Sequence, residues 1–193
     1  SMKNNDPNRY AIDGIAQFIY TLPSNFEIGF VAYNAEVCAK QTLLKNAYRN
    51  EIMKVAETVQ YTGYSNAGDG MMQAVEMLMD SSATEKDIVL LSDGECLMQD
   101  EDATKIAYTA YQSATVQAVQ SGIRIHVIGL GEEMEDIENS IFQAAAKTNG
   151  GVYHSPQALD IQHSIDSILQ QQFHIKQMTA AVIDAGEDAV KMG

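Results

Sequence analysis

The first pattern along the chain is a stripe of apolar residues at helical spacing. It consists of Ile12, Ile15, Phe18, Ile19 and Leu22. Residues three and four apart share one face of a helix, so the stripe predicts an amphipathic helix over residues 10–22 that ends at Pro23. Strand-like stretches follow at 26–33 and 37–44. The turn between them is too short for a crossover, so 37–44 is predicted to be an antiparallel edge strand.

The rest of the chain alternates between helical and strand patterns. Helices are predicted over 46–58, 69–80, 102–120, 135–148 and 156–172, and apolar strands over 87–92, 123–129 and 151–154. Strands that alternate with helices are typical of a parallel sheet whose two faces are both covered. The sequence therefore predicts a three-layer, Rossmann-like α/β fold with a mostly parallel central sheet and one antiparallel edge strand.

Two short stretches carry the candidate chemistry. In the first, Ser65 lies in a loop rich in small residues that precedes the helix predicted over 69–80, and in the second, the apolar strand 87–92 runs directly into Asp93 and Gly94. The carboxyl ends of parallel strands form the ligand-binding edge of an open α/β sheet. A hydroxyl and a carboxylate at that edge suit a hard divalent cation, which prefers oxygen ligands. Taken singly, each stretch could also be only a helix cap or a turn.

In combination and order, these stretches resemble the von Willebrand factor A-type domain, in particular its bacterial members. Such domains carry a metal-ion-dependent adhesion site made from an Asp-x-Ser-x-Ser loop, a Thr in a Gly-rich loop and an Asp followed by Gly. Ser1-Met2-Lys3 resembles the tail of the first loop, Ser65 stands at the Thr position, and Asp93 matches the Asp. The resemblance implies Ser1, Ser65 and Asp93 as ligands of Mg²⁺, or of Mn²⁺ or Ca²⁺. Asp69 is a further candidate, as a carboxylate that orients a ligand from just outside the metal's own shell.

The resemblance covers residues 1–172, but no counterpart of the family's first strand precedes Ser1. In the family this strand lies in the middle of the sheet, between the strands that match 26–33 and 87–92, so a gap is expected there. Residues 173–193 form a C-terminal extension that contains an apolar stretch, 178–184, ending in Asp184. We expect this stretch to fill the gap, from the same chain or by strand exchange in a dimer, and to bring Asp184 near Ser65 and Asp93. The alternative is that the extension lies on the surface or begins another domain.

Composition narrows the range of partners. The chain of 193 residues has 26 acidic and 12 basic side chains, a formal net charge of −14 that repels nucleic acid and anionic membranes. No apolar run approaches the roughly 20 residues of a transmembrane helix, so direct membrane insertion is not expected. Cys38 and Cys96 lie apart from basic clusters and are interpreted as ordinary residues. His126, inside an apolar strand, is interpreted as a packed core residue.

Enzymatic sites fit the sequence poorly. The loop 63–70 has the glycine spacing of a P-loop, but Asp69 and Gly70 replace its Lys and its hydroxyl residue. Gly129 and Gly131 lack the third glycine of a dinucleotide site. Glu95 is the one recognisable acid or base beside Asp93 that a hydrolase could use. We therefore expect a protein that is not an enzyme.

The sequence thus predicts a metal-ion-dependent protein-binding module for adhesion or complex assembly. A protein partner would fill the open position of the cation with a carboxylate. The alternative is a structural or regulatory subunit whose metal site is degenerate. The compartment cannot be read from the sequence, and only the family resemblance favours an extracellular or cell-surface location.

Overall fold

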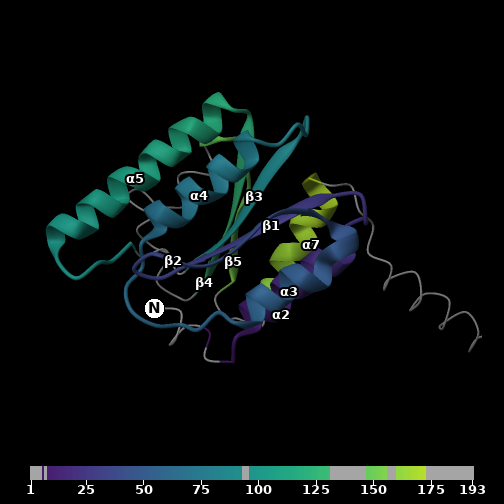
Figure 1. Ribbon diagram of the computed structural model, residues 1–193, viewed down its shortest axis with the longest axis horizontal. Coiled ribbons are helices and arrows are strands. Elements are labelled where there is room, and N and C mark those ends of the chain that lie inside the picture. Colours follow the sequence, from purple (N-terminus) through teal and green to yellow (C-terminus); the bar gives the residue numbers. More distant parts are fainter. Residues whose placement is uncertain (1–5, 7, 93–95, 131–146, 156–159, 173–193) are drawn as a thin grey trace, which may run out of the picture.

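Helices flank the strands on both sides in the computed structural model, which describes residues 6, 8–92, 96–130, 147–155 and 160–172 (Figure 1). The strands are β1 (Glu27–Tyr33), β2 (Val37–Lys45), β3 (Lys86–Ser92), β4 (Ile123–Leu130) and β5 (Val152–Ser155). The helices are α2 (Tyr10–Thr21), the 3₁₀ turn η1 (Asn46–Tyr48), α3 (Arg49–Glu57), α4 (Ala67–Met79), α5 (Glu101–Gln120) and α7 (Ile161–Gln172). Helices α4 and α5 cover one face of the strands, and α2, α3 and α7 cover the other. The predicted three-layer α/β architecture is confirmed.

The predicted elements agree closely with those in the structure. Every helix and strand expected within the described residues is present, with ends that differ by a few residues at most, except that α7 is described only from Ile161. The helix expected over 135–148 falls almost wholly outside the described residues. Gly122 adopts a left-handed backbone with φ of 65° after α5, as a helix C-cap glycine does.

The strands form two separate groups. β1 and β2 make an antiparallel pair, and β3, β4 and β5 make a parallel sheet in that order. The antiparallel direction of β2 and the parallel direction of the other three strands are as predicted. Within the described residues, neither β1 nor β3 has a strand on its remaining edge.

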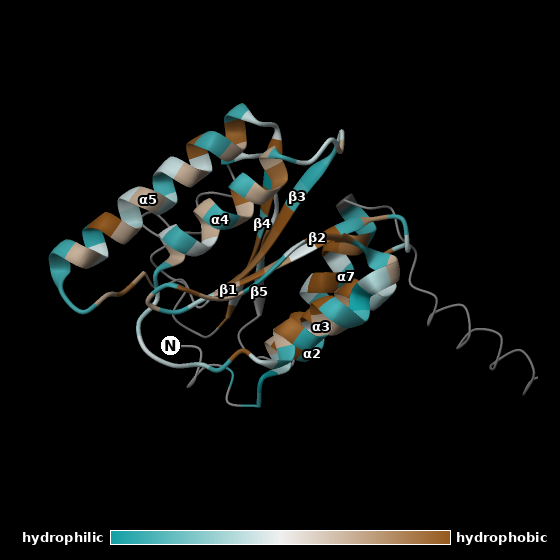
Figure 2. Cartoon of the chain, in the orientation of Figure 1, coloured by the Kyte–Doolittle hydropathy of each residue, from teal (hydrophilic) through white to brown (hydrophobic). Residues whose placement is uncertain are grey.

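Alternating side chains of the strands pack on the two helical layers. Ile123, Ile125 and Val127 of β4 face a core formed with α4 and α5, whereas Ile128 and Leu130 join a core formed with α2 and α7. This strand is apolar on both faces, as buried parallel strands are. Figure 2 shows the same property as hydrophobic colour along β3 and β4. Burial of these side chains is the main stabilising contribution to the fold.

Glycines allow two close backbone approaches. A Cβ atom added at Gly68 would lie 2.3 Å from the carbonyl oxygen of Ala107, so this glycine lets α4 pack directly against α5. Gly150 lies two residues before β5, and a Cβ atom added there would overlap the carbonyl oxygen of Ile125 in β4. Neither backbone oxygen can move aside as a flexible side chain can. Both positions therefore require glycine for packing.

A buried polar network joins the amino-terminal halves of β3 and β4. Asp87 accepts hydrogen bonds from Nε and Nη2 of Arg124, at 2.7 and 2.9 Å. His126, fully buried, accepts a bond at Nδ1 from the Gly151 amide, so its Nε2 carries the hydrogen that is donated to Asp87 at 2.9 Å. Burial opposes ionisation of Asp87, but the bonds from His126 and Arg124 outweigh burial and hold the pKa of this carboxyl below its usual value. The histidine is a packed core residue, as predicted, and it also anchors an ionised acid.

We predict that Gly68→Ala destabilises the protein. At an ordinary helix position, replacing glycine by alanine stabilises by about 0.5–1 kcal/mol. Here the added methyl group would overlap the backbone of α5, so the free energy of unfolding should instead fall by about 1–3 kcal/mol. Urea unfolding measures the change. Glu76→Ala, at an exposed position of α4, is the control and should change stability by no more than about 0.5 kcal/mol; a stabilising Gly68→Ala would contradict the described contact.

We predict that Asp87→Asn lowers the free energy of unfolding by about 2 kcal/mol at pH 7, because it removes a charged acceptor from the buried His126 and the partly exposed Arg124. The folded-state pKa of Asp87 lies below the unfolded value of about 3.9, so its contribution is complete above about pH 5 and is lost as the pH falls further. The difference between wild type and variant should therefore shrink in acid. Urea unfolding measured from pH 3 to pH 7 tests this. Glu85→Gln is the control, because Glu85 is an exposed acid that also pairs with Arg124. A difference that does not vary with pH would contradict the assignment.

Candidate functional site

The loop that carries Ser65 is fixed to the loop that follows β3. The Ser65 amide donates to the carbonyl of Leu97 at 2.8 Å, and the Ser65 carbonyl accepts from the Leu97 amide at 3.1 Å. Leu97 lies five residues beyond Ser92, the last residue of β3. This two-bond bridge therefore holds the two loops that were predicted to share a site against one another.

The carboxyl end of β1 meets the same loop. The Asn66 amide donates to the carbonyl of Asn34 at 2.6 Å, and the Asn66 side chain donates to the carbonyl of Ala35 at 3.2 Å. Asn34 directly follows β1. The end of β1 and the loop after β3 thus meet at residues 65–66, at the edge where open α/β sheets bind ligands.

Asp6 ties the segment before α2 to the same edge. Its buried carboxylate accepts from the amides of Tyr10 and Ala11 at 2.7 and 2.8 Å, and from the Tyr61 hydroxyl at 2.9 Å. These bonds satisfy two free amides at the start of α2 and place a negative charge at its positive end. Burial, with the Asp6 contact in support, raises the pKa of Tyr61, so its hydroxyl remains a donor. Asp6 is therefore anchored to Tyr61, four positions before Ser65.

Sequence reasoning did not find Asp6. Asp6 lies four residues before Tyr10, the first residue of α2, with Pro7 and Asn8 between them. A capping side chain usually bonds to an amide two or three residues later, so the sequence did not identify Asp6 as a cap. Arg9 adds a second tie, because its Nη2 donates to the carbonyl of Val59 at 2.8 Å. Both contacts link the start of α2 to residues 59–61, which are distant in sequence.

Asp69 lies in the first turn of α4 and is exposed. Its amide donates to the side chain of the helix N-cap residue, Asn66, at 3.1 Å. A carboxylate there is stabilised by the amino end of the helix dipole. This capping role explains Asp69 without a metal, and its predicted part in supporting metal ligands stays a prediction.

The other predicted site residues, Ser1, Asp93 and Asp184, lie outside the described residues. Ser92, which precedes Asp93, is buried at the end of β3. No group of three or more His, Cys, Asp or Glu side chains that could hold a metal occurs within the part of the chain that the structure describes. The described part of this edge offers hydroxyl and amide oxygens together with the carboxylates of Asp6 and Asp69, of which Asp6 is already bonded to Tyr10, Ala11 and Tyr61.

The two cysteines show no sign of a reactive site. Burial raises the pKa of the Cys96 thiol, which lies near the start of α4, and also that of Cys38 on the outer strand β2. A raised pKa lowers the fraction of thiolate, the nucleophilic form. The interpretation of both as ordinary residues agrees with these environments.

Among the described residues, no helix combines the length and the apolar character that crossing a bilayer requires. No curated protein is significantly similar to the chain in sequence.

Several solved structures share the fold. They include a von Willebrand factor type A protein from Catenulispora acidiphila (TM-score 0.66, 15% identity), PilB minor pilin from Streptococcus sanguinis (0.68, 15%) and an aerotolerance-related membrane protein from Bacteroides fragilis (0.57, 16%). The matches cover 86%, 88% and 84% of this chain. They cover 38%, 56% and 88% of those chains, so this chain spans well under two thirds of the first two. At these identities, the likeness shows the fold alone.

The family can be assigned from the sequence. The model of the von Willebrand factor type A domain matches residues 7–170, which include every described helix and strand except the last two residues of α7. This chain belongs to the von Willebrand factor type A domain family, whose members generally act as protein-interaction modules.

Proposed function

We propose that this domain binds a protein partner through a divalent cation held at the carboxyl edge of its strands. The observation that carries the proposal is the two-bond bridge between Ser65 and Leu97, which holds the Ser65 loop against the loop that contains Asp93. The cation would be held by the hydroxyl of Ser65 and the carboxylate of Asp93, with Ser1 as a third ligand. Mg²⁺ fits such a set of oxygen donors, and Mn²⁺ accepts the same ligands.

The surrounding contacts support a rigid site. Asn66 fixes the Ser65 loop to the end of β1, and Asp6 bonds to Tyr61, four positions before Ser65. Hydroxyl and backbone oxygens are weak ligands individually, so a cation gains from donors whose positions are already set. The net charge of −14 also raises the local concentration of cations at the surface.

Binding rather than turnover is the proposed output. A cation with few charged ligands keeps excess positive charge, which a carboxylate of a partner protein would neutralise. The partner is therefore a protein that presents an exposed Asp or Glu. Adhesion and assembly of a larger complex are both consistent with this chemistry.

We predict that Mg²⁺ and Mn²⁺ stabilise the full chain. At a metal concentration ten times the dissociation constant, binding to the folded state adds about 1.4 kcal/mol to the free energy of unfolding. Asp93→Ala and Ser65→Ala should abolish this gain, and Ser65→Thr should retain it because the hydroxyl is kept. Thermal unfolding with and without metal, together with calorimetric titration, provides the measurement.

Asp80→Ala is the matched control, because Asp80 is an exposed acid at the far end of α4. It should leave the response to metal unchanged. If wild type and Asp93→Ala respond equally to millimolar Mg²⁺ or Mn²⁺, the metal-dependent proposal fails. The alternative of a structural or regulatory subunit with a degenerate site would then be favoured.

A further inference from the structure

Helix α5 has an exposed side that carries no charge. Charged residues make up 20% of the chain, yet the sequence between Lys105 and Arg124 contains none. Most of this stretch, 106–120, belongs to α5. Surface helices normally meet water with charged side chains, so the uncharged side sets α5 apart. We call this surface the α5 face, and it consists of the exposed residues Ile106, Thr109, Gln112, Ser113, Val116, Val119 and Gln120.

The α5 face includes three large apolar side chains. Ile106 is 71% exposed, Val116 54% and Val119 49%. Among the described residues, no other helix exposes more than one large apolar side chain. The opposite side of α5 is already occupied, because Tyr111 and Ala114 are buried in the core with α4 and β4. The apolar residues of the α5 face therefore contribute little to packing within the described part of one copy.

The net charge of the chain restricts where two copies can meet. With 26 acidic and 12 basic side chains, each copy carries a formal charge of −14, so two copies repel one another. The exposed sides of α2, α3 and α4 all carry acids, including Asp13, Glu51 and Glu76. Two copies that met through one of these helices would set acids against acids, whereas the α5 face brings none together. Of these four helices, α5 is therefore the one suited to contact with a second copy.

The α5 face is complementary to itself when two copies lie antiparallel. Around a twofold axis both copies use the same surface, and residues equally far from the axis along the helix lie opposite one another. We place the axis between Gln112 and Ser113, at the middle of the α5 face. The opposed pairs are then Ile106 with Val119, Thr109 with Val116, and Gln112 with Ser113. The outer pairs bury apolar groups against one another, and the central pair can form a hydrogen bond between the two copies.

The charges near the ends of α5 do not oppose this arrangement. Lys105 lies opposite Gln120, the last residue of the other helix, where the helix dipole favours a cation. The acids of the first turn, Glu101 and Asp102, lie beyond the end of that helix. With 20 residues α5 is about 30 Å long, and it lies at one outer edge of the structure (Figure 1). The pairing can therefore extend along the helix without opposing like charges.

We propose that two copies of this chain associate through the α5 face, as an antiparallel pair with its twofold axis between Gln112 and Ser113. A contact along one helix is small for a protein interface, so the dimer should form at micromolar or higher concentration. The association does not depend on a metal ion. If the proposed metal site also operates, the dimer presents it twice, which strengthens binding to a partner with repeated acidic residues.

Sedimentation equilibrium of the full chain tests the dimer. Between about 1 and 300 µM, with a metal chelator present, the wild type should shift from monomer towards dimer. Gln112→Glu places two carboxylates beside the axis, and Val116→Glu replaces an apolar contact by a charge, so each should raise the dissociation constant about tenfold or more. Gln17→Glu is the matched control, because it adds the same charge at an exposed position of α2 and should leave the dissociation constant unchanged.

Chemical cross-linking near the axis provides an independent readout. In a background of Cys38→Ser and Cys96→Ser, Ser113→Cys should give a covalent dimer with a short bismaleimide reagent, and Gln17→Cys should give no more than the background does. Both positions are exposed, so neither change should disturb folding.

Two results would overturn the proposal. One is a chain that remains monomeric over the whole concentration range. The other is a dimer whose dissociation constant is the same in Gln112→Glu and Val116→Glu as in the wild type, which would assign association to another surface, such as an exchanged strand.

Discussion

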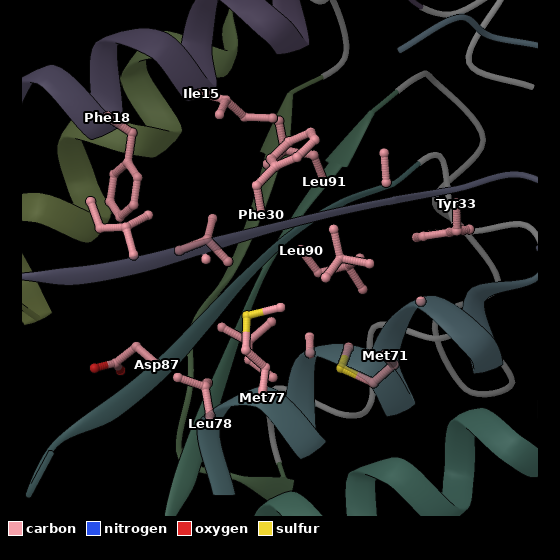
Figure 3. A pocket seen from close by; sticks show the side chains of 18 of the residues that line it. Ile15, Phe18, Phe30, Tyr33, Met71, Met77, Leu78, Asp87, Leu90 and Leu91 are labelled. Carbon is pink, nitrogen blue, oxygen red and sulfur yellow. The ribbon is translucent and has the colours of Figure 1, made fainter. Parts of the chain in front are cut away.

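The open edges of β1 and β3 are the constraint on which the rest of the structure depends. Within the described residues, each strand pairs with another strand on one side only, β1 with β2 and β3 with β4. A space of about 1160 Å³, the slot, lies between the other sides (Figure 3). An extended segment in the slot would bond to both edges, and each such hydrogen bond contributes about 1 kcal/mol.

The contacts of the candidate site do not depend on what lies in the slot. Backbone bonds join Ser65 to Leu97 and Asn66 to Asn34, and the Asp6 carboxylate joins the start of α2 to Tyr61. These contacts link four connections at one edge of the strands without using the interior of the slot. A strand inserted between β1 and β3 would end among them and would bring its terminal side chains to a prepared set of oxygen donors. The slot and the site are in this way two ends of one feature.

Local patterns in the sequence were sufficient for much of the fold. Apolar periodicity and turn residues predict the helices and strands, and Ser65 was found because small residues surround it before a helix. Features that depend on register were not predictable. Asp87 meets Arg124 because β3 and β4 pair at that register, and His126 bonds directly to Asp87 while its other ring nitrogen accepts from the Gly151 amide. Asp6 was missed because its partner Tyr61 is 55 residues away.

Hydrogen exchange of the backbone amides tests the central claim most directly. If a strand fills the slot in the full chain, the amides of β1 and β3 that point away from β2 and β4 should exchange as slowly as those of β4, which is bonded on both sides. Open edges would exchange at rates close to those of loop residues such as Thr62 and Tyr64. Slow exchange along both strands is the result that this account predicts, and fast exchange of the amides facing the slot would contradict it.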